Sequence, residues 1–110
     1  MNGETLLRRD TIKTPLRFLS EYRFWLGELS TVIRIRLFQE MGTERVHFEQ
    51  SHFIHAPTQA GPYMTSRPWN DNEDAALNQA VMFFEMHYHE AVEKGHIPDE
   101  SWLVANDAFS

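Results

Sequence analysis

The sequence contains no cysteine, so disulfide bonds, thiolate zinc sites and cysteine nucleophiles are all excluded. It also has no apolar run near the roughly 20 residues that a membrane-spanning helix requires. Residues 1–10 are polar and charged, which is not typical of a secretory signal. These absences favour a protein of a reducing compartment, and we expect a cytoplasmic location without membrane contact.

The net charge of −6 is unevenly spread along the chain. Residues 1–45 carry eight Lys/Arg and six Asp/Glu, whereas residues 46–110 carry two Lys/Arg and ten Asp/Glu. The acidic second part argues against general nucleic-acid binding, because phosphate contacts need a basic surface. The same asymmetry favours attraction between two copies of the chain.

Length and composition predict one folded domain. The chain has 110 residues, of which 42% are hydrophobic and 13% aromatic, values typical of globular proteins. We expect residues 1–13 to form a flexible N-terminus, because they are polar apart from a short leucine pair. Residues 14–110 are then the folded domain.

Residues 70–95 carry the most complete helix signal in the chain. Asn70 and Asp71 offer N-cap oxygens, and Gly95 can adopt the left-handed conformation that ends a helix. The core-facing stripe at helical spacing consists of Leu77, Ala80, Val81, Phe84, Tyr88, Ala91 and Val92. The opposite face also carries large apolar side chains, so this helix needs a second surface to pack against, and in a short chain that surface is often another copy.

Residues 15–26 also fit a helix. Thr14 suits the N-cap and Pro15 the first helical position. The apolar residues that follow at helical spacing are Phe18, Leu19, Tyr22, Trp25 and Leu26. The pattern therefore predicts a helix over residues 15–26.

Residues 31–49 change to strand periodicity. Apolar and charged side chains alternate over 31–38, and alternation resumes over 45–49 beyond a turn at 41–43. The pattern predicts an amphipathic β-hairpin whose apolar side chains share one face. A single helix over residues 15–41 also fits the spacing, but β-branched residues favour the hairpin.

The rest of the chain is a long loop and a short final segment. Residues 56–69 contain three of the five prolines, which excludes a helix or a central strand. We expect Trp102, Leu103 and Val104 to pack back onto the core. The sequence thus predicts an α+β fold with, in chain order, a helix, a β-hairpin, a long loop, a long amphipathic helix and a short C-terminal segment.

Histidine and carboxylate side chains offer the ligands that zinc, iron or manganese prefer. His52 and His55 are three residues apart, and Glu85 and His89 share a helix face. Arg67 in the loop has the chemistry to hold a small anion. These residues predict a small-molecule or divalent-metal site if the hairpin and the helix bring them together; otherwise we expect no cofactor.

Arg34, Arg36 and Arg45 can project from one face of the hairpin. A two-stranded basic ribbon is able to contact nucleic acid in a groove. The alternative is cross-strand pairing with Glu44 and Glu49 on a solvated face, and the acidic second part of the chain favours it.

Catalysis has little support in the sequence. Ser51 beside His52, or Ser66 with a distant histidine, are the nearest approach to a nucleophile and its base. The chain has no nucleophile elbow, phosphate loop or metalloprotease helix. No reaction is therefore indicated, and an enzyme is not the favoured interpretation.

Residues 61–69 mix aromatic, hydroxyl and arginine side chains, a composition typical of contact surfaces. The predicted interface consists of Tyr63 and Trp69 in this loop with Met82, Phe83 and Met86 on the long helix. We therefore expect a non-enzymatic, self-associating interaction module, a homodimer that can also bind a protein partner. Small-molecule or metal binding and nucleic-acid binding are the alternatives.

Overall fold

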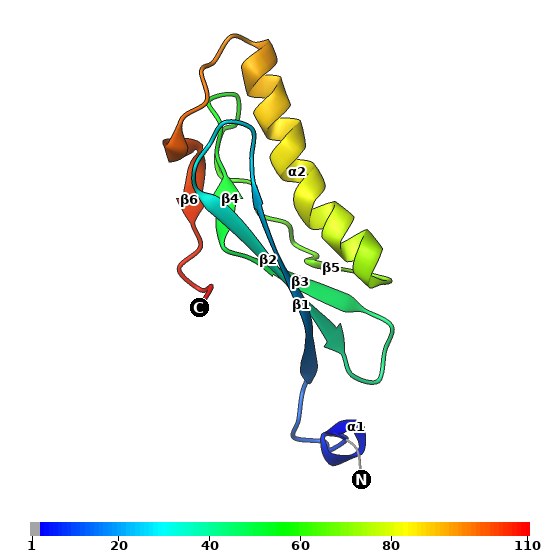
Figure 1. The fold of residues 1–110 in the computed structure, drawn as a ribbon. Coiled ribbons are helices and arrows are strands. Elements are labelled where there is room, and N and C mark those ends of the chain that lie inside the picture. Colours follow the sequence, from blue (N-terminus) through cyan, green and yellow to red (C-terminus); the bar gives the residue numbers. More distant parts are fainter. Residues whose placement is uncertain (1–2) are drawn as a thin grey trace.

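A four-stranded antiparallel sheet crossed by one long helix forms the body of the protein in a computed structural model that describes residues 3–110 (Figure 1). The sheet has the strand order β1-β2-β3-β5, and β4 and β6 pair in a second, two-stranded sheet. In chain order the elements are α1 (Gly3–Leu6), β1 (Leu16–Trp25), β2 (Val32–Glu40), β3 (Val46–Gln50), β4 (His52–Ile54), β5 (Trp69–Asn70), α2 (Glu73–Glu93), the 3-10 helix η1 (Glu100–Trp102) and β6 (Leu103–Ala105). The predicted α+β class is confirmed.

The predicted β-hairpin is confirmed as β2 and β3. The two strands are antiparallel, and Leu37 pairs with Phe48 in their register. Ile33, Ile35 and Leu37 are fully buried, because alternation turns all three toward the core beneath α2. The single helix over residues 15–41 is therefore wrong.

The predicted helix over residues 15–26 is also wrong, because these residues form β1, which pairs with β2 along its whole length. A β-bulge between Phe18 and Ser20 shifts the register of the pair. Apolar side chains on the two sides of a bulge fall out of strict alternation. Their spacing then imitates that of a helix, and only pairing with β2 reveals the strand.

α2 lies within the residues predicted to be helical, but its N-cap residue differs from the predicted ones. Asn72, rather than Asn70 or Asp71, is the N-cap, and its Oδ1 accepts a hydrogen bond from the Ala75 N–H at 2.8 Å. Gly95 follows the helix at φ +87°, as the sequence predicts.

The buried stripe of α2 is rotated from the predicted one. Its buried residues are Ala76, Ala80, Phe84, Tyr88 and Ala91. Leu77 and Val81 are half-buried, and Val92 is exposed, which corrects the placement of Val92 in the core. The buried stripe is centred on alanines because their small side chains let α2 lie close to the sheet.

The C-terminal segment packs back onto the body as predicted. Trp102 and Leu103 are buried, and the His55 N–H donates to the Trp102 carbonyl at 2.7 Å. Val104 is exposed, contrary to the expectation, because alternate residues of β6 point to opposite faces. The Glu100 carboxylate accepts the Thr31 N–H at 2.9 Å and so holds η1 against the β1–β2 turn.

The molecule is elongated, with extents of 56 × 23 × 21 Å. Its radius of gyration is 16.2 Å, against roughly 13 Å for a compact domain of this length. Residues 3–13 project beyond one end of the sheet in Figure 1, while the β1–β2 turn and the C-terminal half of α2 lie at the other end. This shape leaves much of β1 and of the N-terminal segment uncovered.

Candidate interaction surfaces

The structure separates the predicted metal ligands into two groups. His52 and His55 belong to β4 and the residue after it, whereas Glu85 and His89 point into solvent from α2. Among the residues that the structure describes, no group of three His, Asp or Glu side chains is placed to hold a metal ion. The histidine of β3, His47, bonds the Glu40 carboxylate at 2.8 Å instead.

Ser51 and His52 make the contact expected of a nucleophile and its base, but the serine hydroxyl is not accessible to a substrate. The Ser51 Oγ lies 2.9 Å from His52 Nδ1, and it also accepts the Arg34 N–H at 2.8 Å. Ser51 is buried, and burial lowers the pKa of His52. The pair therefore joins β2 to β4, and a substrate has no access to the hydroxyl.

The arginines of β2 bind a carboxylate that the sequence analysis placed on a helix. Glu21 on β1 lies 3.1 Å from Arg34, 2.8 Å from Arg36 and 3.0 Å from Arg23. The hydrogen bonds from Arg34, Arg36 and Arg23 lower the pKa of Glu21 to about 2. The Phe109 ring also covers Arg36, with 4.1 Å from the guanidinium carbon to the ring centroid. These internal contacts weaken the case for phosphate binding by Arg34 and Arg36.

Arg45, the third nucleic-acid candidate, stacks on Trp69. Its guanidinium carbon lies 4.5 Å from the indole centroid, and that of Arg67 lies at the same distance. A Glu40 oxygen is 4.0 Å from Arg45, and the hydrogen bond from His47 is the main cause of the lowered pKa of Glu40. Trp69 is thus partly covered within its own chain, and Arg67 is remote from the histidine pairs.

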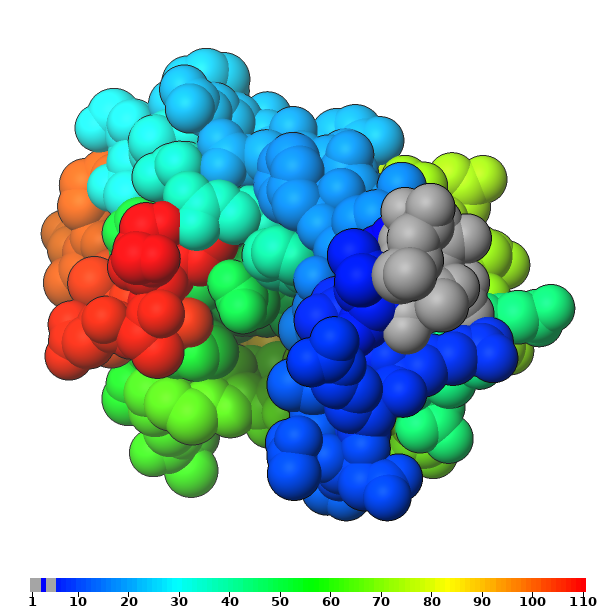
Figure 2. All heavy atoms as spheres, turned by 90° about the horizontal axis from the view of Figure 1, so that it is seen from below, coloured from blue at the N-terminus to red at the C-terminus, as the bar shows by residue number. Residues whose placement is uncertain are grey.

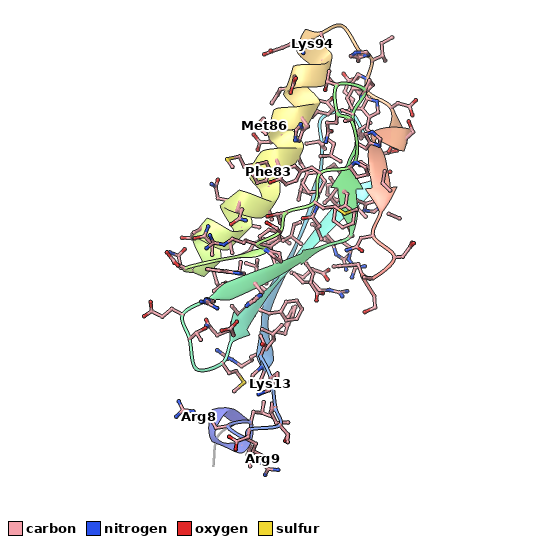
Figure 3. The ribbon with its side chains drawn as sticks, turned by 180° about the vertical axis from the view of Figure 1, so that it is seen from behind. Arg8, Arg9, Lys13, Phe83, Met86 and Lys94 are labelled. Atoms are coloured by element: carbon pink, nitrogen blue, oxygen red, sulfur yellow. The ribbon has the colours of Figure 1, made fainter. Side chains whose placement is uncertain are left out.

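Some residues of the predicted interface on α2 contact each other within the chain, and others remain exposed. Phe83 stacks on Tyr63 with 4.2 Å between ring centroids, so these two residues meet each other within one chain. Met82 is 45% and Met86 is 47% exposed. Figure 3 labels Phe83 and Met86 on the helix. The exposed methionines keep one α2 face available for a partner.

The open edge of β1 is an apolar surface that the sequence pattern did not predict. The strand has ten residues, and among the described residues its only strand partner is β2, so its other edge carries backbone groups without a strand partner there. Its exposed apolar side chains are Leu16 (41%), Phe18 (55%), Tyr22 (44%) and Trp25 (60%). One signal in the sequence does mark the strand: Tyr22 and Phe24 alternate with Glu21 and Arg23.

An apolar groove of about 330 Å³ lies beside the C-terminal residues. Its walls include Phe53, Met64, Pro68 and Phe109, with Glu49 at the side. Figure 2 views the molecule from below, where the red C-terminal residues lie beside the green residues of the loop. The groove has the size and lining that small apolar ligands prefer.

Comparison of the chain with models of protein families, with curated proteins and with solved structures gave no match. No helix among the described residues combines the length and apolar character needed to cross a membrane. The function must therefore be argued from the surfaces themselves.

Proposed function

We propose that this chain is a non-enzymatic module that self-associates through the open edge of β1. The observation that carries the proposal is a ten-residue edge strand on which Phe18, Tyr22 and Trp25 remain 44–60% exposed. Monomeric proteins avoid long apolar edges, because unpaired N–H and C=O groups readily pair with a second strand.

The two edges of the sheet differ in a way that favours β1. The opposite edge strand, β5, has only two residues, and Trp69 within it is covered by arginines. β1 is five times longer, and the features on it that can protect an edge are a bulge and two exposed arginines, Arg17 and Arg23. These features restrict pairing to one register and leave the apolar side chains uncovered.

Antiparallel pairing of two β1 strands about a twofold axis brings opposite ends of the strand together. Leu16 of one copy then lies near Trp25 of the other, and the two sheets join into one of eight strands. Such a dimer buries the most exposed aromatics of the body and satisfies the edge backbone groups.

The test compares the oligomeric state of the wild type with that of a Phe18→Lys/Trp25→Lys variant. Sedimentation velocity over the micromolar range should give a dimer for the wild type and a monomer for the variant, with an unchanged circular dichroism spectrum. Met64→Lys is the matched control, because Met64 is 63% exposed but lies in the loop. A wild-type monomer, or a variant as dimeric as the control, contradicts the proposal.

A second candidate function is the binding of a small apolar molecule in the groove beside Phe109. The volume of about 330 Å³ and the lining by Phe53, Met64 and Pro68 favour it. Native mass spectrometry of gently purified protein separates the two candidates. A retained small molecule on a monomer supports the groove, and a ligand-free dimer supports the β1 edge.

A further inference from the structure

The N-terminal segment carries apolar and basic side chains that its own chain leaves uncovered. We define the arm as residues 3–13. Leu6, Leu7 and Ile12 in the arm are 46%, 36% and 39% exposed. Arg9 and Lys13 are also exposed, and Figure 3 shows both at the end of the molecule away from Lys94. An arm of this composition suits an acidic surface with apolar side chains.

One flank of α2 has the complementary composition. We define the α2 flank as Met82, Glu85, His89, Val92 and Glu93, which recur at helical spacing and are all exposed. α2 itself contains five Asp/Glu and no Lys/Arg. Neither Glu85 nor Glu93 has a cationic partner among the described residues. The flank thus carries two exposed apolar side chains, Met82 and Val92, beside two carboxylates that have no cationic partner among the described residues.

Two members of the α2 flank, Glu85 and Val92, lie on the side of the helix nearest the open edge of β1. Phe83 and His87 lie on the side of the helix that contacts Tyr63, in the 56–69 loop. Helical periodicity places Glu85 and Val92 on the opposite side. Because the sheet runs from β5 to β1 beneath the helix, that opposite side is the side of the β1 edge.

The arm is remote from the α2 flank of its own chain. Gly3 lies beside Met41, at the β2–β3 turn. The C-terminal half of α2 lies at the β1–β2 turn instead, where the Tyr88 hydroxyl accepts the Glu28 N–H at 3.4 Å. The two ends are separated along the 56 Å axis of the molecule (Figure 1).

We infer that the arm of one copy docks on the α2 flank of a second copy. This inference rests on the proposed function, because antiparallel β1 strands place Leu16 of one copy at the β1–β2 turn of the other. The arm precedes Leu16, and an extended chain gains about 3.3 Å per residue. The partner's α2 is therefore within reach of residues 3–13.

In this contact, apolar side chains of the arm meet apolar side chains of the α2 flank, and basic side chains of the arm meet its carboxylates. Leu6, Leu7 and Ile12 cover the apolar surface of Met82 and Val92. Arg9 and Lys13 approach the Glu85 and Glu93 carboxylates, which have no cationic partner among the residues described in one chain. The twofold axis repeats every contact, so each ion pair counts twice in the dimer.

A charge-exchange cycle tests the contact. Arg9→Glu/Lys13→Glu and, separately, Glu85→Lys/Glu93→Lys should each raise the dimer dissociation constant about tenfold. Combining both sets should restore most of the affinity, because the pairs form again with reversed sign. Glu44→Lys is the matched control: Glu44 is an exposed acid in the β2–β3 turn, and its reversal should leave the dimer unchanged.

Cross-linking gives a second readout. A zero-length carbodiimide reagent applied to mixed ¹⁴N and ¹⁵N protein should join Lys13 of one isotope to Glu85 or Glu93 of the other. Arm docking is overturned if the charge reversals weaken the dimer and the combined variant does not recover the affinity. It is also overturned if cross-links form only between residues of the same isotope. Either result leaves the β1 edge to be decided by the Phe18→Lys/Trp25→Lys variant, whereas a wild-type monomer overturns both.

Discussion

Gly27 leaves no room for a side chain, and its replacement by alanine tests how α2 is seated against the β1–β2 turn. Its φ is +54°, and a Cβ at this position lies 2.1 Å from the Tyr88 Oη. The Tyr88 ring is buried and packs edge-on against Trp102, with 5.8 Å between ring centroids. An added Cβ would therefore have to displace a buried ring that packs against its neighbours.

Two contributions lower the free energy of unfolding in the Gly27→Ala variant. The left-handed conformation costs an L-residue about 1–2 kcal/mol, and overpacking a filled site costs about 1–3 kcal/mol. We expect the free energy of unfolding to fall by about 2–5 kcal/mol. Gly42→Ala is the matched control, since Gly42 has φ +83° but nothing within 4 Å of its Cβ. The Gly42→Ala variant should lose only the cost of the left-handed conformation, about 1–2 kcal/mol of unfolding free energy.

Urea unfolding at one fixed protein concentration, followed by circular dichroism, measures both variants. Adding Tyr88→Phe to Gly27→Ala removes the nearest atom but leaves the ring Cζ, 2.3 Å from the added Cβ, so it should restore little of the loss. Equal losses at Gly27 and Gly42 would show that the Tyr88 ring does not crowd position 27. The C-terminal half of α2 would then not contact the β1–β2 turn, and the route proposed for the arm would fail with it.

Two further predictions concern single side chains. The pKa of Glu21 is lowered from 4.5 to about 2 by its arginine hydrogen bonds, so the carboxylate stabilises the fold above pH 4.5 and loses this effect as the pH falls toward 2. Urea unfolding across this range should show the wild type more stable than Glu21→Gln near neutrality and the gap closing in acid; a pH-independent gap would exclude the ion pairs as its cause. Asn72→Ala removes the N-cap of α2 and should cost about 1 kcal/mol in thermal or urea unfolding, whereas Asn78→Ala, at an exposed position inside the helix, should cost nothing. A loss equal in both asparagine variants would rule out capping.

Local signals were sufficient for α2 and for the β2–β3 hairpin. Acidic residues at 73 and 74, the glycine at 95 and the helical apolar spacing act within one or two turns of chain, so no tertiary contact is needed to interpret them. The alternation over residues 31–38 is equally local. The α+β class follows from these two elements.

The candidate site was predictable only in part. Met82 and Met86 were predicted as exposed interface residues, and they are exposed. Phe83 and Tyr63 were assigned to the same interface, but they stack on each other, a contact that depends on where the loop lies. Whether His52 and Glu85 converge also depends on the tertiary structure, and the described residues form no metal cluster.

The long helix, its approximate ends and the alternating hairpin follow from local sequence, because they depend on residues close together in the chain. The assignment of residues 16–25 to an edge strand depends instead on contacts in the folded structure. The bulge at Phe18 removes the period-2 signal over part of the strand, and pairing with β2 restores the structure through contacts that are distant in sequence. The partner of Arg34 and Arg36, Glu21, and the open β1 edge both follow from that non-local pairing.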